Sequence, residues 1–167
     1  MSDKNHANSL LNQGYFLGDT SGKTKNLEEK SVFAICSKKI EFTVKFESNE
    51  KKKIYRKLKN KNKKFGYEEI MCLMHAVKIY YAINGLIDIA PGFSICCDGF
   101  NQRKLTRELQ RLLGNKWDSK KFNFQSSLKE MFGKHNIADK LAYEVNKNGK
   151  KANLILKEKH FRRLNLF

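Results

Sequence analysis

The sequence predicts an α/β fold in which a mixed sheet is flanked by helices. Residues 40–46 alternate apolar and polar side chains with the period of two that is typical of a half-buried strand. Residues 65–84 carry apolar side chains at helical spacing, and residues 93–97 form a short apolar run of the kind found in a sheet covered on both faces. Strand-like and helix-like segments then alternate, which is the order of an α/β layer.

For the first third of the chain, the sequence predicts a tail followed by strands. Residues 1–13 are polar, which predicts a flexible N-terminal tail ahead of a single domain over residues 14–167. The short aromatic and apolar stretch 14–19 predicts a first strand that ends in a turn. Residues 31–37 and 40–46 are close enough along the chain to pair as a hairpin.

The remaining segments alternate between helix and strand. The helix over residues 65–84 is predicted by one apolar stripe and by a stop at Asn84-Gly85; the stripe comprises Ile70, Leu73, Met74, Val77 and Tyr81. Further segments are expected as a strand at 93–97, a helix at 102–113, a short strand at 121–124, a helix at 126–132 and a helix at 137–146. For the last of these a hairpin remains open, because Asn148-Gly149 is a turn signal ahead of the apolar residues 152–156.

The composition indicates a polyanion partner. Among 167 residues there are 34 Lys and Arg against 17 Asp and Glu, a formal net charge of +17. Such a field attracts nucleic acid first and an anionic membrane surface second. No apolar run approaches the roughly 20 residues that span a bilayer, and residues 1–13 lack the apolar core of a secretion signal. We therefore expect no membrane partner and a cytoplasmic location.

Four cysteines are expected to be packing residues. Cys36, Cys72, Cys96 and Cys97 form no CxxC pair, and all lie within apolar segments. Free cysteine in such surroundings behaves as a small hydrophobe, and reduced thiols are typical of an intracellular protein.

Residues 51–64 form a basic insertion. Nine of these fourteen residues are Lys or Arg and none is acidic. Two interpretations stay open: a contact surface for nucleic acid, on which Tyr55 could stack, or a solvated helix face.

Acidic residues follow several of the predicted elements. Asp19 ends the first strand, Asp98 ends the strand over 93–97, and Asp139 lies on a late helix. Carboxylates that converge inside a basic protein are what metal-assisted phosphodiester chemistry requires. Each of them could instead be a turn or helix-cap residue.

Short motifs in this order resemble the ribonuclease H-like (retroviral integrase) superfamily. The stretch Asp19-Thr20-Ser21-Gly22 resembles the Asp-Glu-Ser-Gly of its DUF3800 branch, with Thr20 in place of the acidic residue. Residues 137–142 resemble the late Ala-Asp-Leu helix of that branch. Glu69-Ile70-Met71 is similar to the Glu-Leu-Met of ribonuclease H proper, although Glu68 competes for the position.

The resemblance implies a mixed five-stranded sheet flanked by helices and a divalent-metal-dependent nuclease acting on RNA, DNA or a hybrid. The catalytic residues and metal ligands that it implies are Asp19, Glu69, Asp98 and Asp139. They would hold Mg²⁺ or Mn²⁺, since hard oxygen ligands suit these ions. His135 could assist proton transfer or be a surface histidine. The residues expected to hold nucleic acid are Lys51, Lys52, Lys53, Tyr55, Arg56, Lys57, Lys59, Arg103, Arg107 and Arg111.

Two other functions remain open. The first is a non-catalytic nucleic-acid-binding protein on the same fold, associated with RNA or the ribosome. The second is an adaptor recruited by charge alone to acidic proteins or anionic lipid. The nuclease and the binding protein would share one basic surface, so binding assays cannot distinguish them. Cleavage assays can.

Overall fold

The structure is a computed structural model that describes residues 9–128 and 136–167. Its elements in chain order are β1 (Phe16–Ser21), β2 (Ser31–Cys36), β3 (Glu41–Phe46), α2 (Ser48–Lys61), α3 (Tyr67–Ile83), β4 (Phe93–Cys96), α4 (Gln102–Leu113), η1 (Gly114–Lys116), η2 (Ser119–Lys121), β5 (Phe122–Gln125), α6 (Ile137–Lys147), β6 (Leu154–Ile155) and α7 (Glu158–Arg163).

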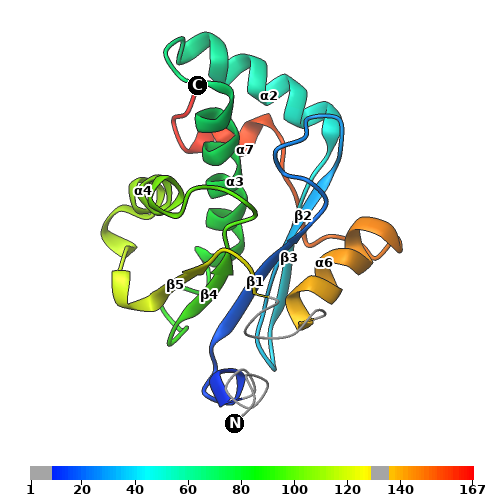
Figure 1. Cartoon of the computed structure of the whole chain (residues 1–167), viewed down its shortest axis with the longest axis vertical. Helices are drawn as coiled ribbons and strands as arrows, with labels where there is room; N and C mark the ends of the chain where they lie inside the picture. The colour runs from blue at the N-terminus through cyan, green and yellow to red at the C-terminus, as the bar shows by residue number, and fades with distance from the viewer. Residues whose placement is uncertain (1–8, 129–135) are drawn as a thin grey trace.

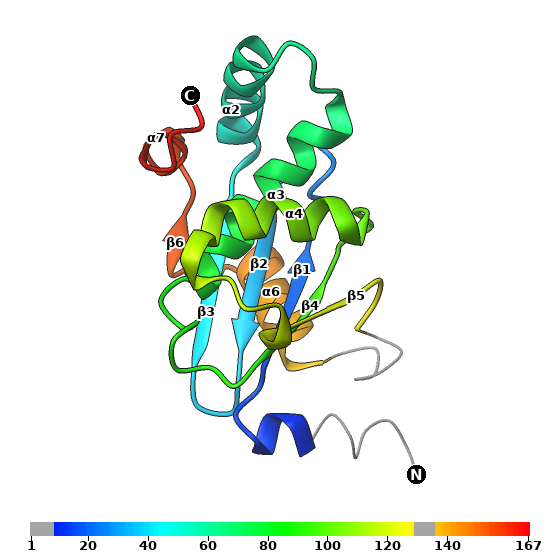
Figure 2. The same ribbon diagram turned by 90° about the vertical axis from the view of Figure 1, so that its left-hand side faces the viewer.

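The strands form one mixed sheet in the order β5-β4-β1-β2-β3-β6 (Figure 2). Strand β2 runs antiparallel to β1 and β3, whereas the pairs β1–β4, β4–β5 and β3–β6 are parallel. The α/β class and the predicted hairpin over residues 31–46 are therefore confirmed. The expected number of five strands is wrong, because the two-residue strand β6 pairs with the outer edge of β3.

Helices cover both faces of the sheet. Helix α3 packs against β2 and β3 and carries α4 on its outer side, while α6 packs against β1, β2 and β3 from the opposite face (Figures 1 and 2). The side chains of β2 explain why both faces must be covered. Phe33 and Ile35 belong to the core beneath α3, whereas Val32 and Ala34 belong to the core beneath α6. Successive side chains of a strand point to opposite faces, so a strand covered on both sides must be apolar throughout.

Helix α3 is more deeply buried than its predicted stripe indicates. Every residue from 70 to 79 is buried, including His75 and Lys78. A helix that contacts a sheet on one side and another helix on the other leaves almost no face for solvent. Within residues 9–128 and 136–167, no helix has the length and apolar character needed to cross a bilayer.

Several local predictions can be compared with the structure. Residues 9–12, expected as part of a flexible tail, form a helical turn whose Leu11 is buried. Residues 137–147 are helical and β6 pairs with β3, so the hairpin alternative near residue 149 is wrong. Residues 126–128 are not helical, and the remainder of the predicted helix, with His135, lies outside the described residues.

The cysteines occupy the places expected of packing residues. Cys36, Cys72 and Cys97 are buried, Cys96 is partly buried, and all four thiols are free.

The turn after β1 depends on Gly22. This residue has a φ of +80°, and a Cβ atom added to it would lie 2.4 Å from the carbonyl oxygen of Lys30. We expect Gly22→Ala to lower the free energy of unfolding by ~2 kcal/mol or more, since the left-handed backbone alone costs about 1–2 kcal/mol with a side chain. Urea denaturation measures the change. Gly149→Ala is the matched control, because Gly149 has a φ of +78° with nothing within 4 Å of the added atom; an equal loss in both variants would contradict the clash at Gly22.

Candidate nucleic-acid interface and the acidic residues

Asp19 lies on β1 and faces α6. Its carboxylate accepts hydrogen bonds from the Thr20 amide at 2.8 Å and from the Asn136 side chain at 3.0 Å. Burial raises the pKa of Asp19, and the negative charge of Asp139 raises it further. The structure therefore brings Asp19 close to Asp139, in the first turn of α6, where the Asn136 side chain caps the helix.

Asp98 interacts with different side chains from Asp19, although both carboxylates raise the pKa of Cys96 beyond the effect of burial. It follows β4 with a φ of 52° and lines a cavity of about 390 Å³. Burial lowers the pKa values of Lys51 on α2 and Lys78 on α3, and the negative charge of Asp98 opposes this lowering. The Oδ2 atom of Asp98 is buried and has no hydrogen-bond partner among the described residues.

The two glutamates at the start of α3 are ion-paired. Lys104 of α4 lies 2.9 Å from Glu69, and this pairing lowers the pKa of Glu69. Lys25 lies 3.2 Å from Glu68. Both carboxylates are therefore satisfied by lysines.

The predicted four-carboxylate centre does not fit a pair of metal ions as these residues stand. Asp19 and Asp139 lie together, whereas Asp98 interacts with the buried lysines and Glu69 with Lys104. In the parts of the chain that the structure describes, no three His, Cys, Asp or Glu side chains form a group that could hold a metal ion. A two-ion centre needs its carboxylates to converge on one point.

Lys51 is wrong as a predicted nucleic-acid contact. Its side chain is fully buried, and its ammonium donates to four backbone carbonyls of the loop after β1. These carbonyls belong to Lys23, Thr24, Asn26 and Glu29, at 2.7–3.4 Å. Lys51 therefore holds this loop onto α2 and is not accessible to a ligand.

Other cations of α2 are engaged with the protein itself. Lys52 pairs with Glu28, and Lys59 donates to the carbonyls of Lys63 and Phe65. Tyr55 is half-buried, with its ring 5.4 Å from that of Tyr67. Arg56 is exposed and forms no ion pair within the described chain.

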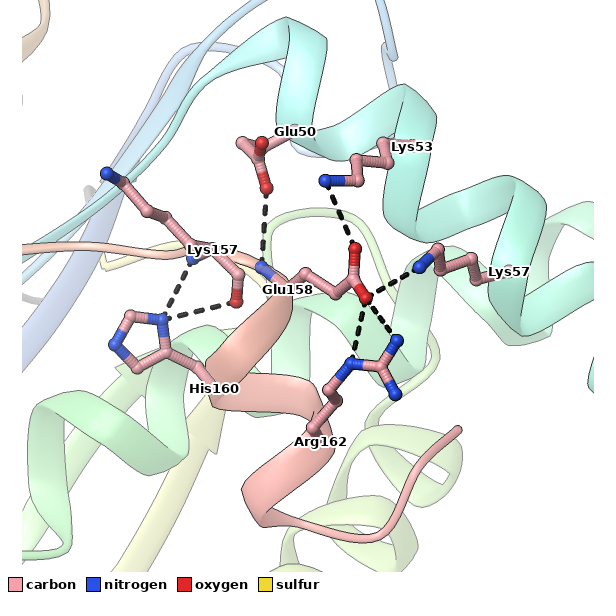
Figure 3. Close-up of polar contacts among 7 residues, drawn as sticks. All are labelled: Glu50, Lys53, Lys57, Lys157, Glu158, His160 and Arg162. Atoms are coloured by element: carbon pink, nitrogen blue, oxygen red, sulfur yellow. Dashed lines mark hydrogen bonds and ion pairs between the residues drawn. The ribbon is translucent and has the colours of Figure 1, made fainter.

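Glu158 gathers the next group of cations (Figure 3). Its carboxylate lies 2.6 Å from Lys57 and 3.1 Å from Lys53 and accepts from Arg162 at 2.8 Å, and these hydrogen bonds lower the pKa of Glu158 to about 2. The contact fastens α7 beneath α2, where Phe161 of α7 is buried against Phe46. Lys53 and Lys57 thus have a structural role.

The turn between α2 and α3 presents cations and aromatic rings together. Lys61, Lys63 and Lys64 are exposed and form no ion pair in the described chain, and beside them Phe65 and Tyr67 are 36% and 46% exposed. Arg103 and Arg107 on α4 are also exposed, and Arg107 lies 3.6 Å from Glu108, a longer contact than that of Arg111 with the same carboxylate. The Lys104–Glu69 pair joins the two helices, and Phe65 and Arg107 line one small hollow.

We call this the basic–aromatic surface and define it as Lys61, Lys63, Lys64, Phe65, Tyr67, Arg103 and Arg107. Arg111, further along α4, is exposed but is paired with Glu108 at 2.9 Å. Sequence reasoning missed Phe65 and Tyr67. The available signal was two aromatic residues on either side of Gly66, directly after the basic run and before the apolar stripe of α3.

Comparison with protein-family models, with curated proteins and with solved structures finds no match for this chain.

Proposed function

We propose that this chain binds single-stranded RNA or DNA through the basic–aromatic surface and does not hydrolyse it. The observation that carries the proposal is the presence of exposed rings, Phe65 and Tyr67, among cations that form few contacts with the protein. Proteins that bind single strands combine cations that follow the phosphates with rings on which bases stack.

The components of the surface have separate roles. Lys63, Lys64 and Arg103 would contact phosphates, which position a strand without reading its sequence. Phe65 and Tyr67 would stack on unpaired bases, whose faces are accessible only outside a duplex. We therefore expect weak sequence preference and stronger binding to single strands than to duplex.

The proposed fold family is the ribonuclease H-like superfamily. Two observations support this. Strands β1–β5 and their flanking helices form a mixed α/β layer. Asp19 lies on β1, Asp98 follows β4 and Asp139 lies on α6, which is the order that the resemblance implies. The ion pair of Glu69 and the interaction of Asp98 with the buried Lys51 and Lys78 favour the non-catalytic function on this fold.

The aromatic contribution can be measured separately. We expect the double variant Phe65→Ala, Tyr67→Ala to bind a fluorescent single-stranded 12-mer roughly 10-fold or more weakly, because stacking contributes about 1–3 kcal/mol per base. Fluorescence anisotropy across a salt series should show the same salt slope as wild type, since no charge changes. Tyr143→Ala removes a ring that is 52% exposed on α6 and should leave binding intact. Undiminished affinity in the double variant would contradict the stacking role.

The catalytic alternative is tested on the same strands. We expect no cleavage of labelled RNA, DNA or hybrid by wild type or by Asp19→Asn in Mg²⁺ or Mn²⁺, with binding preserved in both. Electrophoresis of the products gives the readout. Metal-dependent cleavage by wild type that Asp19→Asn abolishes would overturn the non-catalytic proposal and support the nuclease.

A further inference from the structure

The cavity beside Asp98 lies next to the basic–aromatic surface and shares Tyr67 with it. Its volume is about 390 Å³, and its lining residues are Lys23, Thr24, Lys25, Asn26, Tyr67 and Asp98. It lies among the residues that follow β1 and β4, two neighbouring parallel strands. Ligands of α/β sheets commonly bind outside the carboxyl ends of such strands.

Two buried ammonium groups lie behind the wall of this cavity. Lys78 is fully buried and donates to the hydroxyl oxygens of Thr24 at 2.7 Å and Ser31 at 3.2 Å. Lys51, also fully buried, donates to loop carbonyls only. Among the described residues their hydrogen-bond partners are carbonyl and hydroxyl oxygens only, and the Asp98 carboxylate acts on both ammonium groups from a longer distance. Buried charges without a close counterion are costly, so a negative ligand nearby would stabilise both.

The loop that forms the cavity wall leaves donors unused. The carbonyl oxygens of Lys23, Thr24 and Asn26 accept hydrogen bonds from the Lys51 ammonium, so these acceptors of the loop have a partner. No acceptor for the amide N–H groups of Lys23, Thr24 or Lys25 is found in residues 9–128 and 136–167. Successive unpaired amides in a turn, together with lysine side chains, are a recurrent way to bind an anion.

We propose that this cavity binds a phosphate group. Lys23 would supply an exposed ammonium, Thr24 would donate its hydroxyl hydrogen while accepting from Lys78, and the free loop amides would complete the site. The phosphate could be the 5′ end of a strand lying on the basic–aromatic surface, or that of a free mononucleotide. The inference therefore goes beyond the proposed function, since it requires only the phosphate.

Asp98 determines the direction in which phosphate affinity should change when its charge is removed. Its carboxylate lines the same cavity and would repel the phosphate. Asp98→Asn removes that charge without changing the shape of the side chain. Because Asp98 also favours the protonated form of Lys78, the comparison is made at a pH low enough to keep Lys78 protonated. Phosphate affinity should then increase in Asp98→Asn, whereas a site that used Asp98 to hold a cation or a hydroxyl group would lose affinity.

The experiment uses the full chain and four probes: a 5′-phosphorylated hexanucleotide, its 5′-hydroxyl counterpart, AMP and inorganic phosphate. Titration calorimetry should show at least about 10-fold tighter binding of the phosphorylated strand, as expected for charge-assisted hydrogen bonds. Lys23→Ala and Lys78→Met should each remove most of that preference. Lys147→Ala, a change of an exposed lysine on α6, should leave it intact.

The outcomes separate this inference from the proposed function. Binding of AMP and inorganic phosphate that depends on Lys23 supports the cavity even if the hexanucleotides bind elsewhere. Equal affinity for the two hexanucleotides, with no binding of AMP or inorganic phosphate, overturns the cavity and leaves the basic–aromatic surface untouched. A Lys78→Met variant that unfolds would leave Lys23→Ala and Asp98→Asn as the deciding pair.

Discussion

Replacing Lys63, Lys64 and Arg103 together with alanine is expected to weaken the binding of single-stranded nucleic acid by about 100-fold at ~0.1 M salt. The three side chains are exposed and form no ion pair within the described chain, so their charges are available to phosphates. Each phosphate that is neutralised on a single strand contributes about 0.7 to the slope of log K against log salt. Removing three contacts therefore lowers the slope by about 2, which corresponds to about two decades of affinity at that salt concentration.

The control for this triple variant must change the charge equally. Lys38, Lys39 and Lys147 are also exposed, but they lie in the β2–β3 turn and at the end of α6, away from the basic–aromatic surface (Figure 1). Their triple alanine variant should keep nearly the full salt slope, measured by anisotropy at four salt concentrations. Equal losses in the two variants would show that net charge alone drives binding, and would rule out a defined surface.

The strands and the long helix could be predicted because their patterns are local. The alternation in residues 40–46 and the apolar run at 93–97 come from side chains that a sheet must bury, whatever else surrounds them. Strand β6 could not be predicted in the same way. Only two residues pair there, and the pairing depends on β3, more than a hundred residues earlier in the chain.

In residues 51–64, helical spacing predicts the position of Lys51 better than the density of positive charge does. Lys51, Ile54 and Leu58 are the buried residues of α2, and they lie on one helical face at spacings of three and four. Read as a helix, the run would have placed Lys51 on the inner face with the two apolar residues. Read as a charge cluster, it indicated a ligand contact, which is wrong for Lys51.

The sequence predicted which elements carry or precede the acidic residues, although β1 continues to Ser21 beyond Asp19 and β4 ends at Cys96, before Asp98. The neighbours of these residues could not be predicted. Asp19 lies two residues after Leu17 on β1, and residues two apart on a strand face the same side of the sheet. Leu17 packs beneath α6, so the strand pattern alone indicates that Asp19 also faces that helix. Asp98 lies beyond the end of β4, where no periodicity determines its direction. The pairing of Glu69 with Lys104 depends on how α4 packs against α3, which a local pattern does not specify.

Lys78 is expected to make the stability of this protein depend on pH. Burial lowers the pKa of Lys78 to about 7 and that of Lys51 to about 8, whereas an unfolded lysine titrates at 10.5. Between these values the unfolded chain holds protons that the folded chain has released, so stability rises with pH. From about pH 7 to about pH 8.5 the free energy of unfolding should increase by ~2 kcal/mol, mostly because of Lys78.

The upper limit of this window is set by the thiols. Burial raises the pKa of Cys36 and Cys72 to about 12 from 9.0, so above about pH 9 the unfolded chain loses protons that the folded chain keeps. Their contribution then lowers stability as pH rises, which opposes the effect of the lysines. Below about pH 8.5 this opposition is small compared with the lysine effect.

Lys78→Met isolates the group responsible. The variant removes a buried charge and keeps an unbranched side chain, so it should be at least as stable as wild type near pH 7. Its free energy of unfolding should rise by less than ~1 kcal/mol across the same window, the remainder coming from Lys51. Urea denaturation at four pH values gives both quantities, and Lys147→Met, an exposed change on α6, should reproduce the wild-type slope. If Lys78→Met kept the wild-type slope, Lys78 would be protonated to the same extent in the folded and unfolded chains, and the lowered pKa of this buried lysine would be contradicted.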